Sequence, residues 1–450
     1  MASILLCTKV NCTGWEAWGI TNHQLNSRLP PSAGLLRKGT LQQRFVFSPM
    51  LQLSLSVCAQ VRAQRPLLLS GLLVPCWKVG ILRVDQHSSS AIGLWSWLRA
   101  TRPKTLFILP LPTPQRIPVM DALAAETSDI GVIYLARGAR LHGWGELPVN
   151  HPHYYAKDSA LSGLATAMAV LAPSTHVVAP FGYRGPIRGM ALAAARLLRK
   201  QVVTRSDSNP AKLQFENSWR KAARQRLMRA AYPSTTRVWT VGEQNEVFWR
   251  AYVGRTNTRL IPYSAPVLPG SGAPPSPRTS NPRKLRFLYV GRLVALKNVD
   301  IAVRAFVDVP SHLSAEWTLD IVGDGPERDA LTVIAGGDPR VTFRGSVPYA
   351  ELDQHYARAD VLMLPSDNEA WGLVVNEALA FGCRVLVSDQ VGAGELLSDP
   401  ELGVVLPVGN VTAWREAMID CQKHLTRRPV DPYDPTPDML TELRALGGIR

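Results

Sequence analysis

The sequence predicts an α/β protein with two doubly wound, Rossmann-like domains that face a cleft. Three observations support this fold class. The chain has 450 residues, which is too long for one ordinary hydrophobic core. Short apolar segments alternate with helical segments, as in parallel βαβ units, and this alternation starts twice. A segment rich in Pro, Gly and Ser separates the two series.

The first part of the chain is predicted to contain one such domain, over residues 105–263. Residues 1–104 show no sustained period of 2 or 3.6. We interpret them as an unpatterned basic region outside the fold, which an assignment of the start codon too far upstream would explain. The domain then begins with the apolar strand Thr105–Leu111. Further strands are expected near 131–135, 176–179, 201–204, 237–241 and 259–262. Helices are expected near 119–125, 158–171, 187–199, 211–231 and 243–252.

The second domain is predicted over residues 285–425. Residues 264–284 precede it, and their density of Pro, Gly and Ser is typical of a linker. The domain begins with the strand Leu285–Val290. Its other strands are expected at 318–322, 341–344, 361–364, 384–387 and 404–406. Residues 426–450 are predicted to form a Pro-rich tail that is weakly helical at its end.

The net charge of +15 would suit an anionic partner such as nucleic acid or an acidic membrane surface. The charge is, however, unevenly distributed. Residues 1–104 hold twelve Lys and Arg but only two acids, Glu16 and Asp85, which leaves 38 basic and 33 acidic residues in 105–450. A nucleic-acid-binding protein therefore remains an alternative, but a weak one, because most of the excess charge lies in the unpatterned region.

Cysteine spacing and hydropathy indicate the compartment. The six cysteines match neither a zinc pattern nor a paired-cysteine redox motif, so we predict free thiols in a reducing compartment. No apolar run reaches the ~18–20 residues that span a bilayer, and the N-terminus lacks the order of a secretory signal. We therefore expect a cytoplasmic protein, with peripheral contact to the inner face of the membrane as an option.

Two glycine-containing loops follow the first two strands of the second domain. In Val290–Asn298, Gly291 lets the backbone approach a ligand, and Arg292 and Lys297 can meet a diphosphate from two sides. The segment Ile321–Arg328 repeats this arrangement, with room for a ligand at Gly323 and Gly325.

The most specific segment is Pro365–Gly382. A strand at 361–364 runs into a loop, and a helix begins near Gly372. The free N–H groups of Gly372, Leu373 and Val374 would point at an anion together with the positive end of the helix. Glu369 precedes this helix and Glu377 lies inside it, so their carboxylates can hold different hydroxyl groups of one long polar ligand.

The ordered set of motifs resembles the family-4 glycosyltransferases, which are retaining enzymes of GT-B fold. The set comprises Gly-Arg-Leu-x3-Lys, Gly-Asp-Gly-Pro, Val-x-Phe-x-Gly (341–345), Ala-Asp-Val-x-x-x-Pro-Ser (359–366) and Glu-x7-Glu. The resemblance is strong over about 285–425 and looser over 105–263.

The resemblance implies a role for each matching residue. Arg292 and Lys297 would neutralise the departing diphosphate. Glu369 would hold hydroxyls of the transferred sugar, Glu377 would bind the ribose, and residues near Gly345 would flank the base. The family needs no metal, and the sequence has no Asp-x-Asp motif to hold one. We therefore predict neither a cofactor nor a metal site.

The acceptor side is less specific. Family members usually carry a His near the transferred sugar in the first domain, and the candidates are His142, His151, His153 and His176. We place His142, Tyr183 and Arg184 on the acceptor side. The basic helix at 219–229 is a candidate for membrane contact through Arg220, Lys221 and Arg224, although its charges spread around the helix.

The sequence thus predicts a retaining glycosyltransferase of polysaccharide or glycoconjugate biosynthesis. It would move a sugar from a nucleotide-diphosphate-sugar donor to a saccharide or lipid-linked acceptor. The alternatives are the nucleic-acid-binding protein and a catalytically silent GT-B protein that only binds nucleotide sugars. Because Arg292, Lys297 and both glutamates are present, the silent alternative is disfavoured.

Overall fold

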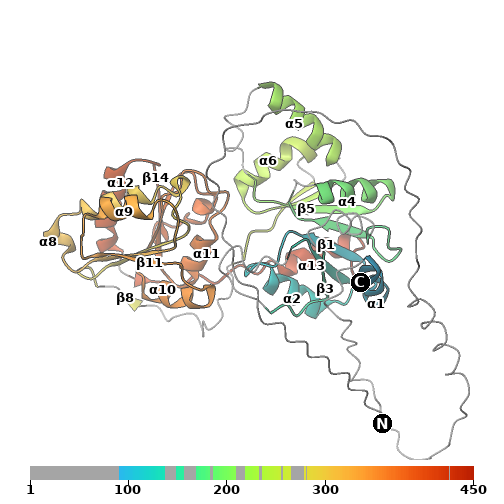
Figure 1. The fold of residues 1–450 in the computed structure, drawn as a ribbon, viewed down its shortest axis with the longest axis horizontal. Helices are drawn as coiled ribbons and strands as arrows, with labels where there is room; N and C mark the ends of the chain where they lie inside the picture. Colours follow the sequence, from blue (N-terminus) through green and yellow to red (C-terminus); the bar gives the residue numbers. More distant parts are fainter. Residues whose placement is uncertain are drawn as a thin grey trace, which may run out of the picture. The chain divides into compact units, whose positions relative to one another are not determined.

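The structure, a computed structural model, describes residues 91–136, 148–156, 169–182, 186–208, 218–232, 236–254, 257–264, 278–279, 281–424 and 426–450. Within these residues the chain forms two large parallel β-sheets covered by helices (Figure 1). This finding confirms the predicted α/β fold class with two doubly wound sheets.

The first sheet has the strand order β3-β2-β1-β4-β5-β6-β7, and its strands are parallel. Its strands are β1 (Thr105–Leu109), β2 (Ile130–Tyr134), β3 (His153–Tyr155), β4 (Val177–Pro180), β5 (Gln201–Arg205), β6 (Arg237–Thr240) and β7 (Thr258–Leu260). Every residue of β1, β2 and β4 is buried. Such continuous apolar runs are typical of parallel strands covered on both faces. The strand order reverses between β1 and β4, where open sheets bind ligands.

The helices that the structure describes beside these strands are α1 (Ala91–Thr101), α2 (Ile117–Glu126), α4 (Pro186–Leu197), α5 (Ser218–Ala231) and α6 (Glu243–Val253). Helix α1 lies before the predicted domain start at residue 105. Its residues Leu94, Trp97 and Leu98 are buried with strand residues of the sheet. Gly131 in β2 leaves room for this packing, because an added Cβ would lie 2.9 Å from the Trp97 ring.

The C-terminal segment completes the core of the first domain. Helix α13 (Thr436–Ala445) contacts α2, and Figure 1 shows it, in red, among the blue and teal elements of the first sheet. Met439 and Leu443 are fully buried in the cluster that also holds Phe107 of β1. The Thr105 hydroxyl donates to the Gly448 carbonyl oxygen at 2.6 Å. The region predicted as a tail therefore contains a helix that belongs to the first domain's core.

The second sheet has the order β11-β10-β9-β12-β13-β14 and is also parallel. Its strands are β9 (Arg286–Val290), β10 (Thr318–Val322), β11 (Val341–Gly345), β12 (Val361–Leu364), β13 (Arg384–Ser388) and β14 (Gly403–Leu406). Each corresponds to a strand predicted from the sequence, within about one residue at either end.

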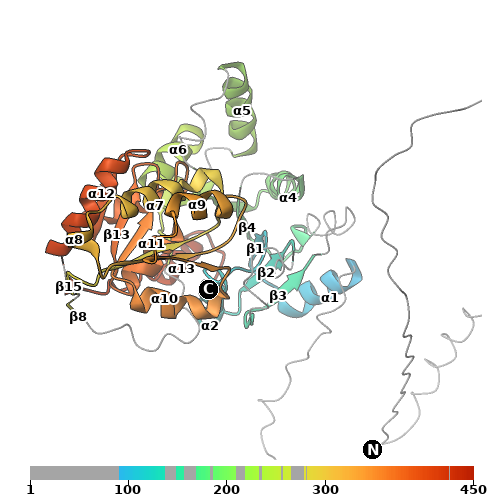
Figure 2. The same ribbon diagram turned by 60° about the vertical axis from the view of Figure 1, so that its left-hand side comes forward.

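Helices cover the second sheet. They are α7 (Val299–Val307), α8 (Ser311–Ser314), α9 (Arg328–Ala335), α10 (Leu352–Arg358), α11 (Leu373–Ala380) and α12 (Val411–Asp420). Helices α7, α9 and α12 pack side by side, with α7 in the middle (Figure 2). The core beneath includes Phe287, whose ring contacts those of Phe306 and Trp317 at centroid distances of 5.7 and 5.3 Å.

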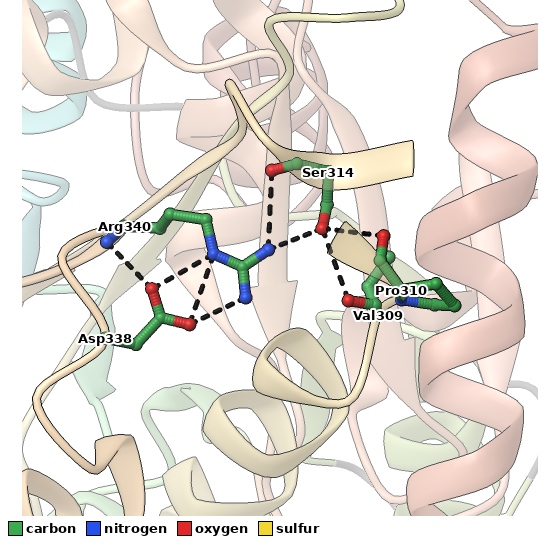
Figure 3. Close-up of polar contacts among 5 residues, drawn as sticks. All are labelled: Val309, Pro310, Ser314, Asp338 and Arg340. Atoms are coloured by element: carbon green, nitrogen blue, oxygen red, sulfur yellow. Dashed lines mark hydrogen bonds and ion pairs between the residues drawn. The ribbon is translucent and has the colours of Figure 1, made fainter. Parts of the chain in front are cut away.

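A polar network fixes the amino-terminal edge of this sheet (Figure 3). Arg340, directly before β11, donates from Nε to both carboxylate oxygens of Asp338 at 3.0 and 3.1 Å. It also donates to the carbonyl oxygen of Ser314, at 3.3 Å, and to its hydroxyl. The Ser314 hydroxyl in turn donates to the carbonyl oxygen of Pro310 at 3.1 Å. These bonds tie together the segments that lead into β10 and β11.

The predicted linker is only partly described. Its strand β8 (Arg278–Thr279) pairs in antiparallel register with β15 (Thr426–Arg427), which begins the C-terminal segment. Residues 265–277 lie outside the described residues. Among the helices that the structure describes, none is both long and apolar enough to cross a membrane.

Candidate active site

The loop after β9 is held in shape by its own backbone and by one tyrosine. Tyr289, the penultimate residue of β9, donates its hydroxyl to the Arg292 carbonyl oxygen at 3.0 Å. A short 3₁₀ turn follows at Ala295–Lys297, and Asn298 ends the loop in the left-handed region at φ 45°. Asn tolerates this conformation better than most residues. The Arg292 side chain is left exposed, and the Lys297 side chain is half-buried.

The glycines of the second loop allow the two loops to pack backbone against backbone. A Cβ on Gly323 would overlap the carbonyl oxygen of Gly291, and a Cβ on Gly325 would overlap that of Leu293. Hydrogen bonds join the same segments, from Gly291 N to Val322 O at 3.0 Å and from Leu293 N to Asp324 O at 2.9 Å. These glycines therefore make room for the first loop, whereas the sequence suggested that they make room for a ligand.

Gly345 extends this arrangement to the end of β11. Its carbonyl oxygen accepts a hydrogen bond from Gly323 N at 2.8 Å. Its φ of 71° lies in the left-handed region, which favours glycine. The three loops that carry Gly291, Gly323 and Gly345 thus form one connected backbone surface at the carboxyl edge of the second sheet.

Glu369 lies on the loop after β12, braced on both sides by backbone bonds. Its N–H donates to Gln390 O at 3.1 Å, its carbonyl oxygen accepts from Gly392 N at 3.1 Å, and Asp367 N donates to Leu296 O at 2.9 Å. The Glu369 carboxylate forms an ion pair with the Lys297 ammonium group. The structure therefore brings together two residues that are 72 positions apart and that the sequence assigned to one ligand.

The charges of Glu369 and Arg292 both act on the hydroxyl of Tyr289, which lies beneath the first loop. Burial, and then the negative charge of Glu369, raise the pKa of the Tyr289 hydroxyl, while the positive charge of Arg292 opposes this shift. Tyr289 is thus affected by two of the three predicted catalytic charges, those of Glu369 and Arg292. Sequence reasoning missed Tyr289, which reads there only as one more apolar position of the strand.

Helix α11 begins directly after Gly372, whose φ of 100° lies in the left-handed region. The space for a side chain is also limited, because an added Cβ would lie 3.0 Å from Leu364 and 3.1 Å from Val391. The first N–H groups of a helix have no acceptor within the helix. Leu373 and Val374 are the first two residues of α11. Their N–H groups therefore lie at the start of the helix, close to Glu369.

Glu377 lies in α11 with its carboxylate turned into the protein. It is 6% exposed, and its carboxylate accepts hydrogen bonds from the hydroxyls of Tyr356 at 2.6 Å and Tyr349 at 3.5 Å. Burial raises the pKa of Glu377 to about 7, although both tyrosine hydrogen bonds act in the opposite direction. No local pattern links the two tyrosines to Glu377, because they precede it by 28 and 21 positions.

The predicted acceptor-side residues His142, Tyr183 and Arg184 lie outside the described residues, as do the side chains of Arg220, Lys221 and Arg224. Among the other histidines, His151 is buried. Its Nδ1 lies 2.6 Å from the Asp121 carboxylate and its Nε2 lies 3.0 Å from the Tyr134 hydroxyl. Burial lowers the pKa of His151 to about 4, so His151 is a neutral part of the core.

The described residues were predicted to hold neither a metal site nor a disulfide. Within the described part of the chain, no three His, Cys, Asp or Glu side chains gather to form a metal site. Cys383 and Cys421 are buried and form no disulfide. The other four cysteines lie outside the described residues.

The second domain is similar in sequence to known glycosyltransferases. The sequence model of the family described as Glycosyl transferases group 1 matches residues 275–424. A sulfoquinovosyl transferase of Arabidopsis thaliana is 32% identical over 128 residues, which are 28% of this chain and 24% of that protein. A D-inositol 3-phosphate glycosyltransferase of Acidothermus cellulolyticus is 28% identical over 286 residues, 60% of this chain and 58% of the relative. The chain thus spans between about a quarter and three fifths of these two relatives.

Solved structures show the same fold. The Anabaena protein Alr3699/HepE, solved with UDP and glucose, superimposes with a TM-score of 0.57. The alignment covers 76% of this chain and all of that one, at 16% sequence identity. Together with the family match, this likeness confirms the resemblance that the motifs predicted.

Proposed function

We propose, from the group 1 glycosyl transferase domain that residues 275–424 form, that this protein transfers a sugar from a nucleotide-diphosphate-sugar donor to a saccharide or lipid-linked acceptor. The observation that carries the proposal is the ion pair of Lys297 with Glu369 at the carboxyl edge of the second sheet. A cation and a carboxylate held together there match the two parts of such a donor, its diphosphate and its sugar hydroxyls.

Donor binding exchanges the partners of this pair. Lys297 turns to a phosphate oxygen, and Glu369 accepts hydrogen bonds from hydroxyls of the sugar. The N–H groups of Gly372, Leu373 and Val374 add donors at the start of a helix. Gly291, Gly323, Gly325 and Gly345 shape the surface beneath the nucleotide, and Glu377 is assigned to the ribose.

In the reaction, the bond between the anomeric carbon and the phosphate oxygen breaks. Its electron pair stays with the diphosphate, which gains negative charge, and the sugar becomes oxocarbenium-like. An acceptor hydroxyl forms the new bond to the anomeric carbon, and its proton passes to the departing diphosphate oxygen. Arg292 and Lys297 stabilise the leaving diphosphate more in the transition state than in the donor, and this difference accelerates the step. Attack on the face that the diphosphate leaves gives retention without a protein nucleophile or a metal.

The cellular setting belongs to the same proposal. We place the enzyme in the cytoplasm, at the inner face of the membrane, in the synthesis of a polysaccharide or glycoconjugate. A glycosyltransferase that receives its donor from cytoplasmic pools and adds to a lipid-linked acceptor works at that surface.

The test is release of free nucleotide from a panel of UDP-, GDP- and ADP-sugars in the presence of EDTA. UDP-sugars come first, since the Anabaena structure contains UDP. We expect turnover of one donor. Arg292→Ala should lower kcat by ~100-fold, the usual loss for one oriented charge donor. Lys297→Ala should lower it similarly.

Arg304→Ala is the matched control, because Arg304 is an exposed arginine of the same domain that pairs only with Asp300 in the described structure. Its kcat should equal that of the wild type. Activity of Arg292→Ala within threefold of the wild type would refute the assigned role. A donor-induced thermal shift without turnover of any donor would instead favour the catalytically silent alternative.

A further inference from the structure

The first domain contains a cavity of about 180 Å³ at the carboxyl edge of its sheet. Its wall includes Pro110 after β1, Gly182 after β4 and Ser206 after β5, together with Met439 of α13. The order of the strands reverses between β1 and β4, and ligands of open α/β sheets bind at such a point. None of the residues assigned to the donor lines this cavity.

The described lining of the cavity is strongly basic. Three arginines contribute to it, Arg116 at the start of α2, Arg188 in α4 and Arg205 at the end of β5. Asp207 is the one acidic residue among the described lining residues. The arginines come from three separate elements, so the fold gathers these charges at one place.

Arg205 is the most informative of the three, because it is only 6% exposed. Its Nη2 donates to the carbonyl oxygens of Ile261 and Pro262 at 2.9 and 3.0 Å. Its guanidinium carbon lies 4.6 Å from the centre of the Tyr263 ring. Its Nε is buried without a hydrogen-bond partner among the described residues. Leaving a buried charged donor unsatisfied is costly.

The charges also repel one another. Burial lowers the pKa of both Arg188 and Arg205, and the positive charge of Arg116 lowers them further. Arg116 therefore lies close enough to act on both. An anion in the cavity would attract all three guanidinium groups and so offset this repulsion.

A structural role of Arg205 explains only part of the arrangement. Its two carbonyl contacts fix the segment that follows β7, and its stacking on Tyr263 adds to this. Neither contact accounts for the unsatisfied Nε or for the presence of two more arginines in the same cavity. Both features fit a site that is completed by a ligand with several acceptor oxygens.

We propose that this cavity binds a phosphate group of the sugar acceptor, held by Arg205 and Arg116 with Arg188 as the third cation. The assignment to the acceptor rests on the proposed function. Guanidinium groups bind phosphate oxygens in pairs, with a fixed fork geometry. Phe181 and Tyr263 line the same cavity and offer apolar surface to the remainder of the molecule.

The test is equilibrium binding of glycerol 3-phosphate and inorganic phosphate to the full chain, at ionic strength matched with chloride. Arg116→Gln is the main variant, because Arg116 is only half-buried and its loss should leave the fold intact. Arg205→Lys keeps the buried charge and removes the fork. We expect ~10- to 100-fold weaker binding in both, the effect of one lost hydrogen bond to a charged group.

Arg99→Gln is the matched control, since Arg99 is exposed on α1 of the same domain and does not line the cavity. It should bind phosphate like the wild type. Equal affinities in all four proteins, or no binding by the wild type, would overturn the proposal.

A measurement of UDP binding shows whether a negative result concerns the phosphate cavity or the proposed glycosyl transfer. Binding of UDP to the same proteins tests the donor site, and Arg116→Gln should leave it unchanged. Arg116-dependent phosphate binding without any donor binding would refute the proposed glycosyl transfer and, with it, the acceptor assignment.

The phosphate could belong to a soluble ester or to a lipid headgroup, and vesicle sedimentation distinguishes these. Binding to phosphatidylcholine vesicles that contain phosphatidylglycerol, weakened by Arg116→Gln but not by Arg99→Gln, assigns the cavity to a lipid headgroup. Binding of glycerol 3-phosphate without such a vesicle effect assigns it to a soluble acceptor.

Discussion

At the scale of single residues, the second domain handles its carboxylates in two different ways. Glu369 is braced by backbone bonds and paired with Lys297, so its charge is neutralised at the surface of the site. Glu377 is buried, and neutral tyrosine hydroxyls are its partners. A carboxylate in such surroundings is expensive to ionise, because desolvation disfavours the charged form.

This difference predicts a pH dependence of stability. Burial raises the pKa of Glu377 to about 7 from an ordinary value of 4.5. Between these values the folded protein holds a proton that the unfolded chain has lost, so the free energy of unfolding should fall as the pH rises through this window and should level off above it. In Glu377→Gln this contribution is absent. Urea unfolding at pH 5 and pH 8 should show that the wild type loses up to ~3 kcal/mol relative to this variant.

The control for this prediction is Glu416→Gln, which changes an exposed glutamate on α12. Its pH profile should run parallel to that of the wild type. If the profile of Glu377→Gln is also parallel, Glu377 is ionised in the folded protein across the whole range.

At the scale of elements, the strand ends of the second sheet form a unit because their loops touch through the backbone. The sequence indicated the strands, their order and the loops that carry charge, since apolar runs and Gly-containing turns are local signals. It could not show that Gly323 and Gly325 accommodate the loop at 291–293. That contact joins residues about thirty positions apart. A local pattern shows that a glycine is present, but it does not show which distant segment packs against it.

Gly325→Ala tests this packing. The added Cβ would overlap the Leu293 carbonyl oxygen, and such overpacking usually costs ~1–3 kcal/mol. We expect a lower Tm, together with loss of the thermal shift induced by UDP. Gly337→Ala is the matched control, because Gly337 has a φ of 76° and open space around it. Its substitution introduces the left-handed strain alone, ~1–2 kcal/mol. Gly337→Ala should keep the UDP-induced thermal shift. The same shift in Gly325→Ala would argue against close packing of the loops.

At the scale of the whole molecule, two helices at the margins of the first domain pack into a core to which the sequence did not assign them. Helices α1 and α13 bury Leu94, Trp97, Met439 and Leu443, yet both lie in segments that the sequence analysis placed outside the domain. Neither has a strong helical period, and Pro residues precede α13. Their helical state depends on tertiary packing, which outweighs weak local propensity.

Leu443→Ala tests the dependence of the first domain on α13. Removing a fully buried leucine side chain costs ~2–5 kcal/mol. Hydrogen exchange should show faster exchange of the amides of β1, which shares its core with α13, and unchanged exchange in β9 of the second sheet. Arg444→Ala, at the neighbouring exposed position, should leave both strands unchanged. Equal protection of β1 in all three proteins would show that α13 is dispensable for this core.

The position of α13 affects how the protein can fold during its synthesis. Domains generally fold in order as the chain leaves the ribosome, the N-terminal one first. Here β1 is translated before the second domain, but the residues that close over it, 436–449, are translated only after that domain. The core of the first domain therefore stays incomplete while the whole second domain is synthesised. Until α13 packs against it, the side of the core that holds Phe107 remains uncovered.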